Sequence, residues 1–256
     1  MKIRILGCGP SYGLPNGCRG FGDCDPHELK NWRTRSGIII EEGDATILVD
    51  TPPEVRMQLF QANVCKIDAV LWTHLHADHT AGIDDVKCYA VDKQMTIPAY
   101  LNEEDVEEFK QRFYFYLNPM AYIGQQYPTF ELHSVHPFEA FTIKDISFLP
   151  ILQHHGDGKS LGVRVGDFAY NTDVDELTDE GFEALKGIKT WILGCVTRTE
   201  NHKHLYLAKA LKWIERVQPQ QAFLTHMGAK MDYAALCREL PPSIRPCYDG
   251  MEIELK

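Results

Sequence analysis

No apolar run in this 256-residue chain is long enough to cross a lipid bilayer, so the sequence predicts no transmembrane helix. Residues 1–6 lack the apolar core of a secretory signal peptide and lead into a glycine-rich turn, which favours a first β-strand. The eight cysteines are scattered, without the spacing of a small disulfide scaffold. These absences favour a cytoplasmic protein with reduced thiols and no membrane partner.

Basic residues are also in short supply. Lys and Arg number 26 against 36 Asp and Glu, for a formal charge of −10. Proteins that grip long nucleic acids usually present a basic face, and no Gly/Lys-rich arm interrupts this chain. The charge therefore favours a small substrate over a long nucleic acid.

The chain contains no low-complexity linker, and its two halves show the same rhythm of strands and helices. Its length suffices for one large domain with a full core. We therefore predict a single α/β domain over residues 1–256, built from two similar halves.

Residues 73–79 carry the densest chemistry, with the sequence Thr-His-Leu-His-Ala-Asp-His. A short apolar strand at 67–72 precedes them, and a helical turn follows at 81–83. Imidazole and carboxylate groups are ligands that suit a borderline divalent metal such as zinc. The alternative is a polar loop of solvated histidines, but four potential ligands within six positions favour a metal centre.

This His-x-His-x-Asp-His pattern resembles the signature of the metallo-β-lactamase superfamily. The stretches at 22–26, 30–36 and 246–253 are similar to the PhnP-like branch of that superfamily, which contains phosphodiesterases and is related to ribonuclease Z. The resemblance implies a four-layer αββα sandwich with a two-metal site at one edge.

Further strand ends supply the ligand types that a two-metal site still needs. A strand at 146–152 leads to His154 and His155, a hairpin ends near Asp173, and a strand at 222–225 ends at His226. The family spacing to Gly162 favours His155, while His154 stays an alternative because adjacent strand residues point to opposite faces. The resemblance thus implies His74, His76 and His155 for one ion, Asp78, His79 and His226 for the other, and Asp173 between them.

The resemblance also implies the chemistry. Two cations ~3.5–4 Å apart hold a hydroxide at neutral pH and neutralise the oxygens of a phosphodiester. His204, before a helix predicted at 205–215, corresponds to the histidine that gives a proton to the leaving oxygen, unless it is simply solvent-exposed. Asp78 counts as a catalytic residue as well as a ligand, and Asp50 is expected to orient the metal histidines. Zinc is the favoured metal, with manganese as the alternative.

Two other segments have open interpretations. Residues 102–128 begin with an acidic helix, for which Asn102 is the expected cap, and continue into the aromatic run 113–116. These aromatics could form a lid over a nucleotide, or could pack into a core or a homodimer interface. Cys18 and Cys24 could bind a structural metal, but they are fewer and farther apart than the cysteines that hold a third zinc in some PhnP-like proteins.

The leading hypothesis is a binuclear metal-dependent hydrolase of small phosphodiesters, such as a cyclic phosphate or a nucleotide. A ribonuclease Z-like nuclease would need a basic arm, which is absent. A thioester hydrolase of the glyoxalase II type would leave His204 unexplained. A metal-binding module without catalysis is opposed by the full set of ligand types.

Overall fold

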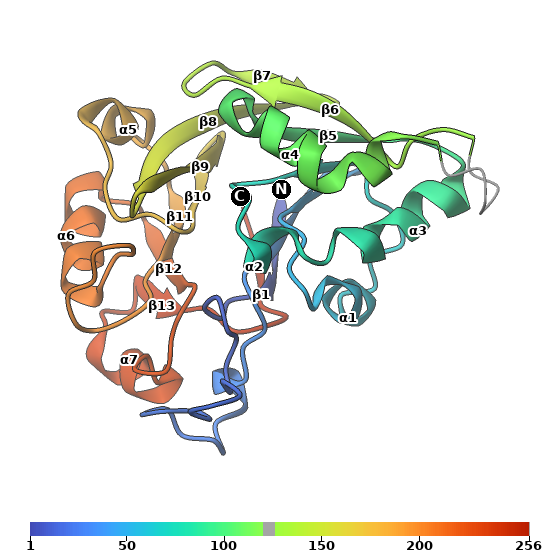
Figure 1. Ribbon diagram of the computed structural model, residues 1–256. Helices are drawn as coiled ribbons and strands as arrows, with labels where there is room; N and C mark the ends of the chain where they lie inside the picture. Colours follow the sequence, from blue (N-terminus) through green and yellow to red (C-terminus); the bar gives the residue numbers. More distant parts are fainter. Residues whose placement is uncertain (120–125, 256) are drawn as a thin grey trace.

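The computed structural model describes residues 1–119 and 126–255. Two seven-stranded sheets form its centre (Figure 1). The strands of the first sheet, in spatial order, are β14 (Glu252–Glu254), β1 (Lys2–Gly7), β2 (Gly37–Glu42), β3 (Ala45–Val49), β4 (Ala69–Leu71), β5 (Ile97–Asn102) and β6 (Phe130–Val135). Those of the second are β13 (Ile244–Pro246), β12 (Gln221–Thr225), β11 (Thr190–Gly194), β10 (Phe168–Asn171), β9 (Gly158–Val165), β8 (Ile146–His155) and β7 (Phe141–Ile143).

Helices cover the outer face of each sheet. On the first sheet these are α1 (Val55–Gln61), α3 (Ile83–Lys93) and α4 (Val106–Phe113), with the short α2 (Ala77–Thr80) at the strand ends (Figure 1). On the second they are α5 (Asp179–Ala184), α6 (Leu207–Val217) and α7 (Tyr233–Glu239). Three 3₁₀ turns complete the described elements: η1 (Leu29–Asn31), η2 (Glu103–Asp105) and η3 (Tyr114–Leu117).

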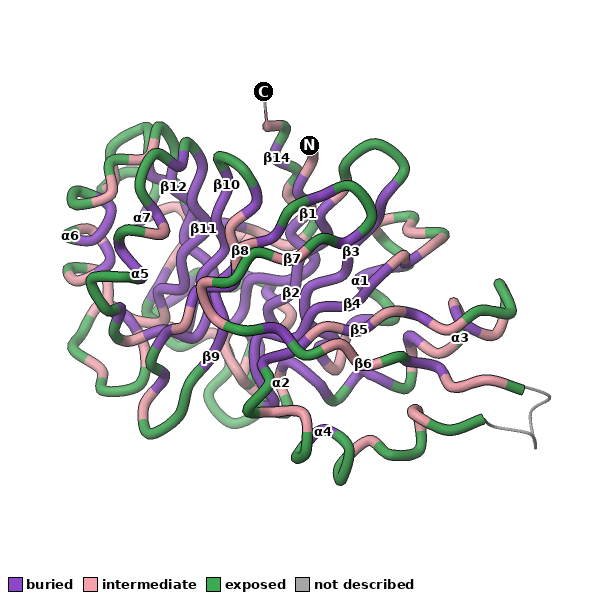
Figure 2. The backbone as a smooth tube through the Cα atoms, turned by 90° about the horizontal axis from the view of Figure 1, so that it is seen from above, coloured by how far each residue is buried: buried purple, intermediate pink, exposed green. Residues whose placement is uncertain are grey.

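The hydrophobic pattern of β2 shows how the layers are specified. Ile38 and Ile40 point into the core between the sheets, together with Phe148 and Val163 of the second sheet. Ile39 points the other way and joins the residues of the α1 and α3 layer. Successive strand residues face opposite sides of a sheet, so a run of isoleucines serves a strand that is covered on both faces. Figure 2 shows these central strands as buried and the outer loops as exposed.

The two halves repeat one arrangement. β3, β4, β5 and β6 run parallel in the first sheet, and β10, β11, β12 and β13 run parallel in the second. Antiparallel strands complete each sheet, among them β1 and β2 in the first and β8 and β9 in the second. The predicted αββα sandwich is confirmed, whereas the single-domain organisation of residues 1–256 stays a prediction. No described helix has the length and apolar character to cross a membrane.

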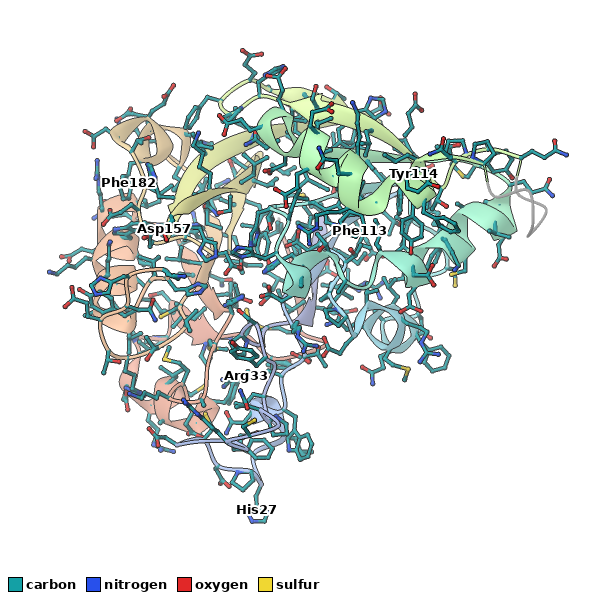
Figure 3. All side chains as sticks on the ribbon, in the orientation of Figure 1. His27, Arg33, Phe113, Tyr114, Asp157 and Phe182 are labelled. Atoms are coloured by element: carbon teal, nitrogen blue, oxygen red, sulfur yellow. The ribbon has the colours of Figure 1, made fainter. Side chains whose placement is uncertain are left out.

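The described part of the 102–128 segment packs partly into the core. Phe109 of α4 is fully buried, and its ring lies 4.7 Å from that of Trp72. Tyr114 stays exposed just beyond Phe113 (Figure 3). Asn102 stands at the N-cap position of the 3₁₀ turn η2, as expected, but its side chain makes no capping hydrogen bond there. Residues 120–125 of the predicted lid or interface lie outside the described residues.

Phe109→Ala tests the packing of α4 on the first sheet. We expect the free energy of unfolding to fall by about 3–5 kcal/mol, because the change removes a buried ring and leaves a cavity beside Trp72. Guanidinium unfolding would measure this loss. Phe60→Ala, at a position that is 75% exposed on α1, is the control. Equal losses in the two variants would contradict this account of α4.

Candidate metal centre

The residues of the 73–79 stretch follow β4 directly and are held from both sheets. The indole nitrogen of Trp72 donates to Thr51 Oγ1 at 3.0 Å, which fixes the chain just before the histidines. The Leu161 amide of β9 donates to the Thr73 carbonyl at 2.7 Å. This second bond joins the two sheets at the edge where the ligand types gather.

Three of the gathered residues have left-handed backbone conformations. Asp50 follows β3 with φ 66°, Asp173 follows β10 with φ 46°, and His226 follows β12 with φ 55°. Non-glycine residues adopt this region at a cost and are enriched in it at functional sites. At each of these strand ends the backbone turns sharply, next to the shared edge of the sheets.

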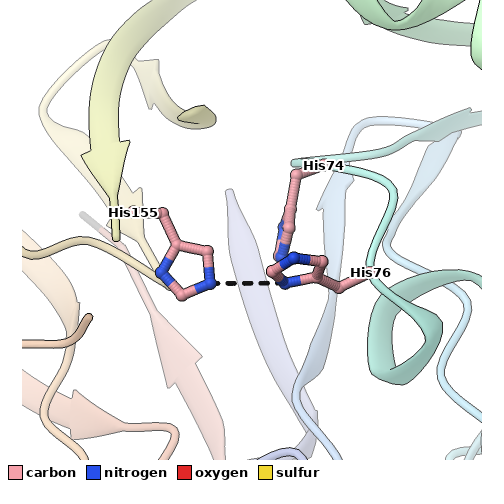
Figure 4. Close-up of side chains that lie close together, drawn as sticks. All are labelled: His74, His76 and His155. Carbon is pink, nitrogen blue, oxygen red and sulfur yellow. Dashed lines mark hydrogen bonds between the residues drawn. The ribbon is translucent and has the colours of Figure 1, made fainter. Parts of the chain in front are cut away.

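His74, His76 and His155 form a first cluster (Figure 4). His155 Nε2 lies 3.3 Å from His76 Nδ1, and the His74 ring centroid is 4.5 Å from that of His76 and 5.2 Å from that of His155. His155 is buried, whereas His154 is exposed on the opposite side of β8. The structure therefore brings His155, and not His154, to the cluster.

Asp78, His79 and His226 form a second cluster. Asp78 Oδ2 lies 3.4 Å from His79 Nε2 and 3.6 Å from His226 Nε2. The rings of His79 and His226 are parallel within 9°, with centroids 5.8 Å apart. These residues come from α2 and from the end of β12, so both sheets contribute to the cluster.

The buried carboxylate of Asp173 lies between the two clusters. Its Oδ2 atom is 2.8 Å from His79 Nε2 and 3.2 Å from His226 Nε2. Its Oδ1 atom is 3.7 Å from His155 Nε2 and 3.2 Å from His204 Nδ1. One oxygen thus faces each cluster, which is the arrangement required of a ligand shared by two ions.

Several buried nitrogens at this centre lack hydrogen-bond partners. They are Nε2 of His74, Nε2 of His79 and both ring nitrogens of His226. The Nε2 atoms of His79 and His226 lie close to the Asp173 carboxylate without hydrogen-bond geometry. Buried polar atoms without partners are uncommon and call for an explanation such as a bound ion. Imidazole nitrogens and carboxylate oxygens in this arrangement fit a divalent metal.

The charges of the centre support the same interpretation. Burial lowers the pKa of His79, but the carboxylates of Asp50 and Asp173 outweigh it and hold the pKa well above its usual value. Burial raises the pKa of Asp173, but His226 and His79 outweigh it and hold the pKa well below the usual range. A proton on His79 thus balances buried carboxylate charge, and a divalent cation would replace that proton on binding.

Asp50 supports a histidine from each cluster. Its Oδ2 atom lies 2.6 Å from His79 Nδ1, and its carboxylate accepts bonds from the Thr73 amide and hydroxyl at 2.8 and 2.9 Å. The same hydroxyl lies 3.0 Å from His74 Nδ1. Partners on the second ring nitrogen orient a metal histidine and fix its tautomer. This role of Thr73 was not predicted, because no sequence pattern marks a threonine before the motif as a hydrogen-bonding partner of Asp50 and His74.

His204 lies at the side of the centre that Asp173 Oδ1 faces. Its ring is stacked on that of His226 with centroids 5.2 Å apart, and it is 4.7 Å from the ring of His155. Burial lowers the pKa of His204 to about 4. The structure therefore puts this histidine beside the metal-ligand candidates and not in solvent.

Residues 8–36 contact the chain just after His226, a member of the second cluster. The guanidinium of the buried Arg33, labelled in Figure 3, donates to the Met231 carbonyl at 2.6 Å. The Met227 amide donates to the Cys8 carbonyl at 2.8 Å. Cys18 is exposed, while Cys24 is buried with its thiol toward a backbone carbonyl. Neither belongs to a potential metal cluster within residues 1–119 and 126–255.

The chain matches one protein family and is similar to several known proteins. The family model described as "Beta-lactamase superfamily domain" matches residues 45–227. The chain is 30% identical over 259 residues to a Porphyromonas gingivalis protein named octanoyltransferase, and the match covers 98% of this chain and 51% of that protein. It is 30% identical over 121 residues to the probable metallo-hydrolase YhfI of Bacillus subtilis, with 44% and 43% covered. The chain thus spans about half the length of the first of these relatives.

Solved structures agree with the fold. A new diphosphatase from the PhnP family has a TM-score of 0.88 at 29% identity, and the match covers 100% of this chain and 98% of that one. The short form of human tRNase Z has a TM-score of 0.72 at 16% identity over the full length of both chains. The second similarity concerns the fold alone.

Asp50→Asn tests the support of the metal centre. The amide would turn an NH₂ group toward the donors of Thr73 or His79. His79, and His74 through Thr73, would then lose orientation. We expect metal affinity, measured by competition with a chromophoric chelator, to fall by about 10–100-fold. Asp84→Asn, on the exposed face of α3, is the matched control. Unchanged affinity in Asp50→Asn would contradict the assigned role.

Proposed function

The chain belongs to the metallo-β-lactamase superfamily and resembles its PhnP family, and from this premise we propose that it hydrolyses small phosphodiesters of the cyclic-phosphate or nucleotide type. The observation that carries the proposal is the position of Asp173. Its two carboxylate oxygens face two separate histidine clusters. One of these oxygens, Oδ1, lies 3.2 Å from His204 Nδ1. Two neighbouring cations beside a histidine suit a reaction that develops negative charge on several oxygens.

We propose that two divalent ions, zinc in preference to manganese, bind here. His74, His76 and His155 would hold one ion, Asp78, His79 and His226 the other, and Asp173 both. When bound, such ions supply Lewis acidity toward phosphoryl oxygens and lower the pKa of the attacking water. The unpartnered nitrogens of His74, His79 and His226 support this assignment. Eight free thiols are in keeping with a reducing compartment, so we assign the reaction to the cytoplasm.

His204 is proposed to donate a proton to the leaving oxygen. Water adds its oxygen to phosphorus, the bond from phosphorus to the leaving oxygen breaks, and the electron pair stays on that oxygen. The proton from His204 neutralises it, and the ring is restored by the proton that the attacking water releases. An anionic ester beside His204 favours the protonated ring, which offsets the effect of its burial. Asp78, whose carboxylate lies 3.6 Å from His226 Nε2, is proposed to act both as a metal ligand and as a catalytic residue.

The relatives suggest which substrates to compare. The solved neighbour at 29% identity is a diphosphatase. In a diphosphate with a substituent at each end, each phosphorus carries two bridging oxygens, as the phosphorus of a phosphodiester does. The octanoyltransferase aligns over only 51% of its length, so its name assigns no activity to the aligned half. An acyl thioester, the substrate of the glyoxalase II-type alternative, is the second candidate substrate class.

A substrate panel tests the proposed function. Purified, metal-loaded protein would be assayed on bis(p-nitrophenyl) phosphate, cyclic and linear nucleotides, dinucleoside diphosphates, an octanoyl thioester and precursor tRNA. We expect turnover of small phosphodiesters or diphosphates, with kcat/KM at least about tenfold above that for the thioester and the tRNA. Preference for the thioester would favour the second candidate, and loaded protein inert toward the whole panel would favour a binding module.

His204→Ala tests the proton donor. We expect kcat for a diester with a nucleoside leaving group to fall by about 10²–10⁴-fold, the usual contribution of general acid catalysis. Elemental analysis should show unchanged metal content. His202→Ala is the control, because it removes an exposed histidine from the same loop. Retention of most of the activity in His204→Ala would refute the role.

A further inference from the structure

His204 lies in a loop between β11 and α6 that has little regular structure to hold it. The residues on either side are anchored by the backbone, because the Leu205 amide donates to the Val174 carbonyl at 2.9 Å and the Leu207 amide to the Thr197 carbonyl at 2.9 Å. Residues 201–204 lie between the anchored residues Thr197 and Leu205 and take no part in these two bonds. Their conformation therefore depends on side-chain contacts within the turn and on contacts with neighbouring segments.

One side chain makes the local contacts. Asn201 Oδ1 accepts the Lys203 amide at 2.8 Å and the His204 amide at 3.2 Å. A side-chain oxygen that receives backbone N–H groups two and three residues later closes a tight turn. The second of these amides belongs to the proposed proton donor itself, so the oxygen of Asn201 helps to set the direction in which the His204 ring leaves the backbone.

The same turn is docked on the hairpin between β8 and β9. The Lys203 carbonyl lies 2.8 Å from His155 Nδ1, which leaves His155 Nε2 to face the first cluster. A Cβ built on Gly156, which has φ +59°, would stand 3.0 Å from Lys203 Cγ. The turn that carries the proton donor thus also contacts a candidate metal ligand, and the hairpin limits its movement.

We propose that Asn201 is a positioning residue for this reaction, one that acts through His204 by capping the turn and so keeps the His204 ring beside Asp173 Oδ1. The inference rests on the proposed function, because it assumes that His204 protonates the leaving group. It goes beyond that function by assigning a role to a residue that is not one of the candidate metal ligands. Removal of the Asn201 oxygen should weaken proton donation and leave the metals in place.

The test compares two thymidine phosphodiesters whose leaving groups differ in their need for a proton. Thymidine 5′-(p-nitrophenyl phosphate) releases a stable phenolate, whereas thymidylyl-thymidine releases a nucleoside alkoxide that must be protonated. For Asn201→Ala we expect kcat on thymidylyl-thymidine to fall about tenfold. This is less than the ~100-fold loss that a full 1 Å displacement at a reacting centre can cause, because other contacts still hold the turn. On the nitrophenyl ester kcat should change by less than about twofold.

Four further measurements separate positioning from a general structural effect. Asn201→Asp keeps the acceptor oxygen and should retain at least about half of the wild-type kcat, while Glu200→Ala should match the wild type on both substrates. Elemental analysis of Asn201→Ala should give the wild-type metal content. A crystal structure of Asn201→Ala should show His204 Nδ1 displaced from its 3.2 Å approach to Asp173 Oδ1.

The inference is overturned if Asn201→Ala behaves like the wild type, if it loses activity equally on both substrates, or if Asn201→Asp is as impaired as Asn201→Ala. His204→Ala, run in parallel, separates this failure from that of the proposed function. If His204→Ala shows the leaving-group dependence and Asn201→Ala does not, only the role of Asn201 is lost. If His204→Ala shows no such dependence, the proton-donor proposal fails and the inference fails with it.

Discussion

The carboxylate of Asp173, buried between two groups of histidines, is the constraint on which the rest of the site depends. Taking a carboxylate out of water costs several kcal/mol unless positive charge compensates it. Among the described residues, the ion-pair partners of Asp173 are histidines from both halves of the fold, and cations held by those histidines would compensate its charge as well. Because Asp173 follows β10 of the second sheet and His79 lies on α2 beside the first, the sheets must meet at this edge for the charge to be balanced.

Strained backbone at the strand ends is the second part of the same arrangement. Asp50, Asp173 and His226 each take a left-handed conformation, which costs of the order of 1–3 kcal/mol per residue where it is not supported. Deeply buried strands and the bonds around Thr73 and Arg33 provide the support. The sandwich fold therefore serves the chemistry through rigidity, because it holds short polar side chains at defined positions without long loops.

Much of the site could be predicted from the sequence, because a compact motif is local information. The 73–79 stretch and the polar residues after three other strands identified every side chain that the structure gathers in the two clusters. Contacts between distant segments carry no such signal. The Lys203 carbonyl reaches His155 across 48 positions, and the Thr73 hydroxyl joins Asp50 to His74 only because β3 and β4 are neighbours. Helix limits were predicted less closely, since α6 begins at Leu207, two residues after the predicted start.

The most direct test of the account is the number of metal ions that the seven side chains bind. Apoprotein prepared with a chelator would be reconstituted with excess zinc or manganese, freed of unbound metal, and measured by elemental analysis against protein concentration. The account predicts two equivalents per chain, falling to one or fewer in Asp173→Ala, because that variant removes the only group with an oxygen toward each cluster among the residues described. Fewer than one equivalent in the unmodified protein, or two equivalents retained in Asp173→Ala, would contradict it.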